Sequence, residues 1–181
     1  MNDGPDQILI IRHGEKPPPS GPPPEGVKED GSPHAHSLIV RGWQRAGALA
    51  HLFAADGMRP NAILSPPAEG EGSDHSRPYE TITPLAARLA ITPDHSHKLD
   101  EEDALVAAVL RLQGRVLICW EHNRITRIAT ALAAHPETIP AHWPDDRFDL
   151  IWVFEREPSG RYRFRQQPQY LLAGDADVTE G

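Results

Sequence analysis

Short runs of apolar residues recur along the chain, and polar or turn-forming residues bound each run. Three of them, at residues 7–12, 61–66 and 115–120, are continuous rather than alternating, which is typical of strands buried on both faces. Residues 91–95 form a weaker candidate strand. Near the end of the sequence, FDLIWVFER and RYRFRQQ flank EPSG, a pattern that predicts a β-hairpin.

Segments with helical character separate these runs. We predict helices over residues 38–56, 76–90, 101–112 and 123–134, and in the first, third and fourth the apolar residues return about every three to four positions. Pro84 predicts a kink or a break in the second helix. Because strands alternate with helices, the chain is expected to form an α/β fold with a largely parallel sheet covered on both faces.

A single domain is expected over residues 1–181, with two long loops at about 14–36 and 67–75. The length of 181 residues suffices for one hydrophobic core and is too short for two comfortable ones. Loops this long in a compact domain are usually functional or mobile. The first loop contains PPPSGPPP, which is typical of an extended, polyproline-like segment.

The composition argues against some classes of binding partner. Hydrophobic residues make up 39% and charged residues 24% of the chain, as in an ordinary globular protein in water. The formal net charge of −8 argues against a general nucleic-acid binder, so an anionic ligand would need a local positive pocket. No apolar run approaches about 18 residues and no signal-peptide pattern opens the sequence. We therefore expect a cytoplasmic protein without a nucleic-acid or membrane partner.

Basic and imidazole side chains follow the ends of the three clearest predicted strands. The first strand ends in RHG at 12–14, the second leads through a loop to HSRPYET at 75–81, and the third ends in EHN at 121–123. Ligands bind at the carboxyl ends of strands in open α/β sheets. We therefore expect two imidazoles and two guanidiniums to share one crevice: Arg12, His13, Arg77 and His122.

This set of side chains suits the transfer of a phosphoryl group. Two guanidiniums can bind phosphate oxygens bidentately. A neutral imidazole can attack phosphorus when a backbone acceptor holds one ring nitrogen and the other keeps its lone pair, and Gly14 would let the backbone approach closely enough to do so. A second, charged histidine would stabilise the equatorial oxygens. A carboxylic acid would protonate the leaving oxygen and then activate water.

The chain resembles the histidine phosphatase superfamily, also called the phosphoglycerate mutase-like family. The resemblance rests on RHGE after an aliphatic strand, RGWQRAGALA, ILSPP followed by SRPYETITPLAARL, and VLICWEHN. It covers about residues 7–135, and WPDDRFDLIWVF fits the closing strand of a bacterial branch. It implies one histidine phosphatase-like domain, a three-layer α/β/α sandwich around a mostly parallel sheet.

The resemblance also implies roles for individual residues. His13 would be the nucleophile, Arg12 and Arg77 would hold the phosphoryl group, and His122 would complete the cluster. The expected partner is a small phosphorylated substrate or a phosphate ion, and a phospho-enzyme route needs neither a metal nor another cofactor. Two further residues would line the mouth of the site and bind substrate: Glu15 and Lys16.

The histidine pairs His34/His36 and His95/His97 suggest an alternative reading as metal ligands. Imidazoles two residues apart can ligate zinc. Both pairs lie in loop-like sequence without a matched set of cysteines or carboxylates, so we expect no specific metal site.

The general acid is the point at which the sequence departs from the family. A branch resembling acid phosphatases has Asp directly after the second histidine, where this chain has Asn123, which cannot donate a proton usefully. Mutase-like members use a glutamate from the segment that is HSHKLDEEDAL here, which offers Glu101 and Glu102. Glu121 is the other alternative, although strand alternation would turn it away from His122 unless the strand has already ended. We place Glu101 or Glu102 slightly ahead of Glu121, and some family members need no strong acid.

The sequence therefore predicts a metal-independent phosphatase that hydrolyses phosphate monoesters through a phospho-His13 intermediate. A phosphoglycerate-type mutase is the first alternative, but 181 residues leave little room for the additional segments with which mutases enclose their substrate. A non-catalytic protein that binds a phosphate ligand is the second, because no clear acid is present.

Overall fold

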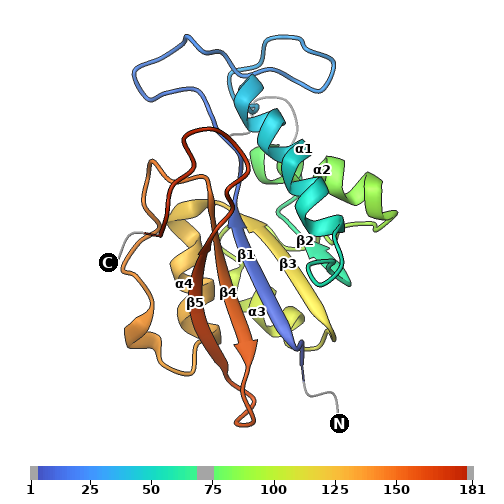
Figure 1. Ribbon diagram of the computed structural model, residues 1–181, viewed down its shortest axis with the longest axis vertical. Helices are drawn as coiled ribbons and strands as arrows, with labels where there is room; N and C mark the ends of the chain where they lie inside the picture. Colours follow the sequence, from blue (N-terminus) through green and yellow to red (C-terminus); the bar gives the residue numbers. More distant parts are fainter. Residues whose placement is uncertain (1–3, 69–75, 179–181) are drawn as a thin grey trace.

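A five-stranded sheet runs through the centre of the protein, which a computed structural model describes over residues 4–68 and 76–178 (Figure 1). Its strands are β1 (Gln7–Arg12), β2 (Ala62–Leu64), β3 (Arg115–Trp120), β4 (Leu150–Arg156) and β5 (Tyr162–Pro168), in the spatial order β2-β3-β1-β4-β5. β1 and β2 pair with β3 in parallel, whereas β4 pairs antiparallel with both β1 and β5. A parallel core extended by an antiparallel hairpin confirms the predicted fold class.

Helices cover both faces of the sheet, which gives the three layers. They are α1 (Val40–Ala54), α2 (Ser76–Leu89), α3 (Glu102–Val109) and α4 (His122–Leu132), with a short 3₁₀ turn, η1 (Pro136–Thr138). In β1, Ile8 and Ile10 pack with α3 and α4, while Leu9 and Ile11 pack with α1 and α2 on the opposite face. Successive strand residues point to opposite faces, so a continuous apolar run fits a strand covered on both sides.

Two predicted elements differ from those in the structure. Pro84 lies inside α2 without ending it, because Ile82, Leu85 and Leu89 on either side are held by burial against the sheet. The predicted strand at 91–95 is reduced to a single parallel bridge between Leu64 and Asp94. Within the described ranges, no helix combines the length and the apolar character needed to cross a bilayer.

The loop after β1 projects beyond the carboxyl ends of the parallel strands and is held by its own hydrogen bonds (Figure 1). Isolated bridges join Gly26 to Ile39 and Val27 to Pro33. The indole of Trp43 on α1 donates to the Val27 carbonyl at 2.8 Å. This segment therefore has a defined backbone course. Most of the second predicted loop, at 69–75, lies outside the described residues.

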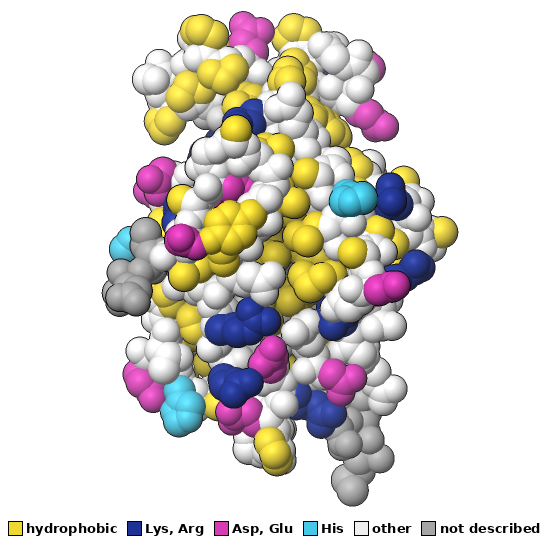
Figure 2. Space-filling model, in the orientation of Figure 1, with side chains coloured by type: hydrophobic (Ala, Val, Ile, Leu, Met, Phe, Trp, Pro, Cys, Tyr) yellow, Lys and Arg dark blue, Asp and Glu magenta, His cyan; other side chains and the backbone are white. Residues whose placement is uncertain are grey.

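The C-terminal segment returns to the same end of the molecule and is tied there by a buried arginine. Arg45 on α1 forms ion pairs at 2.8 Å with both Glu15 and Asp175. Burial of Asp175 opposes its ionisation, but hydrogen bonds from Arg45 and from backbone amides outweigh this effect and lower its pKa to about 2. Figure 2 shows that charged side chains of both signs are interspersed over the face in view, with apolar side chains between them.

Candidate active site

The register of the sheet brings the two predicted histidines together. β1 and β3 are parallel neighbours, and Arg12 pairs with Trp120 at the last position of each strand. The chain leaves both strands at the same edge, so His13 and His122 emerge side by side. Their ring centroids lie 6.1 Å apart with the planes nearly perpendicular, at 86°. Both side chains are buried.

His13 is held as a neutral imidazole in one tautomer. Its Nδ1 lies 2.7 Å from the Gly14 carbonyl oxygen, which can only accept, so Nδ1 carries the proton and Nε2 keeps its lone pair. Burial lowers the pKa of His13 well below its usual value, and the positive charge of Arg12 lowers it further. A ring in this state can act as a nucleophile without first losing a proton.

The backbone that carries His13 is fixed between α1 and α2. The Gly14 amide donates to Thr81 Oγ1 at 2.8 Å, and that hydroxyl donates to the Arg77 carbonyl at 2.7 Å. A Cβ on Gly14 would lie 2.9 Å from the Gly42 carbonyl oxygen. Gly14 is thus required for close packing against α1, a reason that the sequence did not suggest, and Thr81 positions the turn from the other side.

The guanidinium of Arg12 is buried and only partly satisfied. Its Nη1 donates to the Asp145 carbonyl at 2.6 Å, and its Cζ lies 3.9 Å from the centroid of the Phe148 ring. Nε and Nη2 are buried without a hydrogen-bond partner in the described part of the chain. Burial lowers the pKa of Arg12 to about 10. Each unsatisfied buried donor costs about 1–3 kcal/mol, so the two donors favour an anionic ligand.

His122 lies between two carboxylates. Its Nδ1 is 2.7 Å from Glu121 Oε1, and its Nε2 is 3.2 Å from Asp145 Oδ1. β3 ends at Trp120 and Glu121 is the N-cap of α4, where its carboxylate accepts from the Asn123 amide at 3.0 Å. The strand has therefore ended before Glu121, which removes the objection that strand alternation would turn it away from His122.

Three cations are grouped around these rings. The charges of Arg12, Arg77 and Lys16 all act on His13 and oppose its protonation. Burial lowers the pKa of Lys16, and the charges of Arg12 and Arg77 lower it further. Arg77 extends from the first turn of α2 and donates to the Ala35 carbonyl at 3.3 Å. This gathering supplies a local positive pocket in a chain whose net charge is −8.

A cavity of about 590 Å³ opens beside this cluster, and we call it the Arg12–His122 cavity. Besides those two residues, its wall includes Lys16, Asn123, Asp145 and Phe148. His13 does not form part of the wall and its side chain is 3% exposed. Its ring lies against Phe148, at 6.1 Å between centroids, as well as against His122. The imidazole is thus directly behind the wall of the cavity.

The structure places three of the predicted carboxylates away from this cavity. Glu15 is turned towards α1, where it binds Arg45 and Arg41. Glu101 accepts from the Lys98 amide at 2.8 Å, and Glu102 is fully buried with its Oε1 3.1 Å from the Trp120 indole nitrogen.

Glu121 is next to His122 and is held in its ionised form. Burial opposes this ionisation, but the hydrogen bond and the charge of His122 together with the Asn123 amide lower the pKa of Glu121. A carboxylate in this state fixes the orientation of the imidazole more readily than it releases a proton.

Sequence reasoning missed Asp145 and Phe148, which precede β4. β4 is antiparallel to β1, so its first residues lie at the edge where β1 ends. The segment is anchored by the buried Trp143, whose indole donates to the Arg147 carbonyl at 2.8 Å. The acids of WPDDRFD can be placed near the end of β1 only once the antiparallel pairing of β4 with β1 is known.

The histidine pairs do not form a metal site in the part of the chain that the structure describes. His34 and His36 lie edge to face, with ring centroids 5.9 Å apart, and His95 Nδ1 contacts Ser65 Oγ at 3.0 Å. No group of three or more metal-ligating side chains occurs among these described residues.

Known proteins resemble this chain in structure rather than in sequence. No protein-family model and no curated protein matches the sequence. SixA from Agrobacterium tumefaciens superposes with a TM-score of 0.53 at 18% identity, covering 91% of this chain and 97% of that protein. The protein histidine phosphatase SixA complexed with tungstate gives a TM-score of 0.57 at 16% identity, with coverages of 90% and 97%.

A third similar structure is the mycobacterial glucosyl-3-phosphoglycerate phosphatase Rv2419c with VO3. Its TM-score is 0.54 at 14% identity, and the match covers 89% of this chain and 97% of the mycobacterial protein. These similarities span nearly the whole of both chains, which confirms the fold that the sequence motifs implied. This chain has the fold of the histidine phosphatase, or phosphoglycerate mutase-like, superfamily.

Proposed function

We propose that this protein is a metal-independent phosphatase that hydrolyses phosphate monoesters through a phosphohistidine on His13. The observation that carries the proposal is the state of His13, a neutral ring fixed at Nδ1 by the Gly14 carbonyl at 2.7 Å. Its Nε2 keeps its lone pair near Arg12, whose buried Nε and Nη2 have no hydrogen-bond partner among the described residues. A cytoplasmic location stays a prediction beside this proposal.

The phosphoryl group would bind where the cations gather. The open Nε and Nη2 of Arg12 suit two oxygens of one phosphate, and Lys16 and Arg77 add positive charge. Structures with this fold hold tungstate in SixA and VO3 or inorganic phosphate in Rv2419c. These complexes support an oxyanion as the ligand here.

The reaction would proceed in two displacements. In the first, His13 Nε2 forms a bond to phosphorus while the bond to the ester oxygen breaks, and that oxygen takes up a proton. In the second, water attacks the phosphohistidine, loses a proton and releases inorganic phosphate and the free ring. Glu121 orients His122 so that Nε2 faces the cavity, where it can hydrogen-bond the phosphoryl oxygens as charge develops.

Asp145 is the carboxyl group that the geometry favours as proton donor. Its Oδ1 lies 3.2 Å from His122 Nε2, and its side chain is 88% exposed and forms part of the cavity wall. Glu121 is occupied with His122 Nδ1, while Glu101 accepts from the Lys98 amide before α3 and Glu102 accepts from the Trp120 indole of β3. A protonated Asp145 would give its proton to the leaving oxygen and recover one from water.

One observation favours the alternative of a non-catalytic phosphate-binding protein. The side chain of His13 is only 3% exposed and does not line the cavity, and the Phe148 ring covers one face of the Arg12 guanidinium. A phosphate could then contact Lys16 and His122 without reaching His13 Nε2.

Turnover of 4-nitrophenyl phosphate, measured with and without a chelator, tests the proposal. We expect hydrolysis that resists the chelator and is lost in His13→Ala, while His51→Ala, an exposed histidine at the end of α1, retains it. Quenched reactions should contain a phosphoryl adduct that is labile in acid and stable in base. Stabilisation by phosphate without any turnover would support the binding protein instead, and transfer to a bound alcohol would support the mutase.

A further inference from the structure

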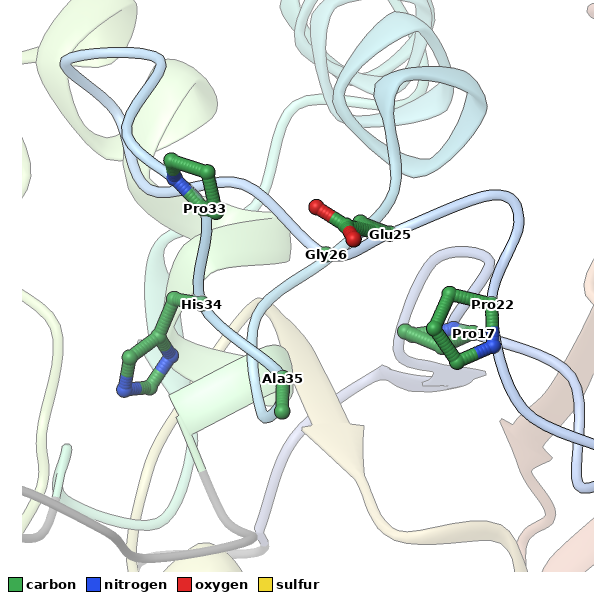
Figure 3. Close-up of a pocket in the computed structure, with 7 residues that line it drawn as sticks. All are labelled: Pro17, Pro22, Glu25, Gly26, Pro33, His34 and Ala35. Carbon is green, nitrogen blue, oxygen red and sulfur yellow. The ribbon is translucent and has the colours of Figure 1, made fainter.

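A second cavity lies within the loop after β1 and is unassigned by the proposed reaction (Figure 3). It has a volume of about 260 Å³, and we call it the proline cavity because three prolines line it. Figure 3 shows Pro17 and Pro22 on one side and the turn that carries Pro33 and Ala35 on the other.

The proline cavity adjoins the Arg12–His122 cavity. Pro17 forms part of the wall of both, and Lys16, the preceding residue, lines the Arg12–His122 cavity. The remaining part of a phosphate ester whose phosphoryl group lies beside Arg12 would then lie past Pro17, towards the second cavity.

The wall of the proline cavity suits an apolar, planar group. Proline rings are apolar and have no amide hydrogen to satisfy, and Gly26 and Ala35 add no polar side chain. His34 also lines the cavity, but its ring is directed away from Pro17 and Pro22, and its Nδ1 contacts Ser37 Oγ at 2.9 Å (Figure 3). Among the described residues that line this cavity there is no lysine or arginine, and Glu25 is its carboxylate. A second anionic group on the ligand would be repelled there, whereas an uncharged ring would gain van der Waals contacts on several sides.

Backbone hydrogen bonds hold the loop around the cavity, so the cavity is preformed. The His34 amide donates to the Gly26 carbonyl at 2.8 Å, and the Val27 amide donates to the Leu38 carbonyl at 2.8 Å. A Cβ on Gly26 would lie 2.3 Å from the His34 carbonyl oxygen, so the two sides of the loop meet at a glycine. Binding a ligand between such fixed walls orders few additional side chains, which favours affinity.

We propose that the proline cavity binds the leaving group of the substrate and selects phosphate monoesters of uncharged aromatic alcohols. This inference rests on the proposed function and adds the substrate class. The aromatic ring contacts Pro17, Pro22 and Pro33 while the ester oxygen points back towards Asp145 and His122. Specificity then resides in the loop, and the chemistry resides at the strand ends.

Filling the cavity tests the inference. Ala35→Trp places an indole at its wall, and Ser20→Trp adds the same bulk to an exposed position of this loop that lines neither cavity. We expect Ala35→Trp to lower kcat/KM for 2-naphthyl phosphate by about tenfold or more and to leave ethyl phosphate within about twofold. Ser20→Trp should leave both values unchanged. Circular dichroism and thermal unfolding establish that each variant is folded.

A variant that changes the charge of the cavity wall gives an independent test. Glu25→Gln should raise kcat/KM for 4-carboxyphenyl phosphate relative to phenyl phosphate by about threefold at low salt, because it removes a like charge from the wall. Equal effects of Ala35→Trp on naphthyl and ethyl phosphates, or none on either, would overturn the inference and leave the phosphatase proposal intact.

Failure of the proposed function has a different signature. If the wild-type protein hydrolyses neither ester, the affinities for naphthyl phosphonate and methyl phosphonate, measured by calorimetry, test the cavity independently of catalysis. Preferential binding of naphthyl phosphonate that disappears in Ala35→Trp would support the cavity as an aromatic site. Equal binding of the two phosphonates would overturn it.

Discussion

At the scale of single residues, the hydrogen bond between His13 Nδ1 and the Gly14 carbonyl determines which ring nitrogen can react. The same bond competes with burial and with Arg12, both of which lower the pKa of the ring. A histidine in this setting differs from one in solution in charge as well as in tautomer, and both differences can be measured.

We predict that His13 stays neutral as the pH falls through 6.5. Its folded-state pKa lies well below that value because of burial and of Arg12. The unfolded chain takes up a proton there, so the free energy of unfolding should decrease as the pH falls below 6.5. Ring ¹⁵N shifts recorded from pH 8 to pH 5, and assigned with His13→Ala, should show a protonated Nδ1 throughout. A midpoint close to 6.5 would contradict the prediction.

A second prediction concerns the proton donor. Asp145→Asn should lower kcat for alkyl phosphates by about 100-fold or more and change 4-nitrophenyl phosphate much less, because nitrophenolate leaves without a proton. Asp146→Asn, at the neighbouring exposed carboxylate that lines the same cavity, tests whether the effect belongs to Asp145 alone. Steady-state kinetics on both substrates also compare Glu101→Gln, Glu102→Gln and Glu121→Gln. If one of these shows the larger dependence on the leaving group, Asp145 is not the donor.

The sequence predicted the cations and imidazoles better than it predicted the acid. Arg12 is the last residue of β1, and His122 follows the end of β3. Ligands bind at the carboxyl ends of parallel strands, and the structure brings both side chains to one cavity. Asp145 precedes an antiparallel strand, whose position relative to β1 depends on a pairing that no local pattern specifies. Glu15 looked like a cavity residue because it follows His13 closely, yet Arg45 on α1 draws it to the other side.

At the scale of elements, α2 matters to the site through more than Arg77. Thr81 accepts from the Gly14 amide, and Glu80 accepts from the Ser37 hydroxyl and the Leu38 amide at 2.7 and 2.8 Å. One helix thus holds both ends of the long loop after β1. Glu80 and Thr81 are consecutive residues of α2, so these two contacts share a single rigid support.

Thr81→Val should weaken both folding and the chemical step. It leaves the buried Gly14 amide without its acceptor, which costs about 1–3 kcal/mol in free energy of unfolding. It also loosens the turn that carries His13, so kcat should fall while KM changes little. Thr81→Ser keeps the hydroxyl and should recover kcat. Urea unfolding and steady-state kinetics measure the two effects, and an unchanged kcat in Thr81→Val would show that the contact does not position His13.

The elements themselves were largely predictable, and their ends were not. Amphipathic spacing located α1, α3 and α4, and continuous apolar runs located β1 and β3. The predicted strand at 91–95 contains Pro93, which cannot donate to a ladder, so only Asp94 forms a bridge. Where a helix ends depends on tertiary contacts, and α3 ends at Val109 although its apolar pattern continues to Leu112.

At the scale of the whole molecule, three cations gather around His13 inside an acidic protein. The net charge of −8 opposes the approach of anions, while Arg12, Lys16 and Arg77 would attract the phosphoryl group of the proposed substrate over a short range. Salt screens the long-range repulsion more than the contacts inside the pocket, since charges farther apart than about 10 Å are largely screened at 0.1 M.

Substrates with several negative charges should therefore respond to salt differently from simple monoesters. Raising sodium chloride from about 10 mM to about 150 mM should increase kcat/KM for a nucleoside triphosphate relative to that for phenyl phosphate, because repulsion by the protein as a whole weakens. The ratio of the two values, measured across the salt series, is the readout. A ratio that falls with salt would indicate that local cations, rather than the overall charge, dominate the encounter.

The pairing of Arg45 with both Glu15 and Asp175 has a practical consequence for laboratory work. Glu15 is two residues from His13, so the C-terminal segment and the turn that carries His13 are linked through Arg45. An affinity tag or a linker at the carboxyl end would be attached on the side of this link. One at the amino end would precede Gln7, at the far end of β1 from His13 (Figure 1). The amino end is accordingly the better point of attachment for purification and immobilisation.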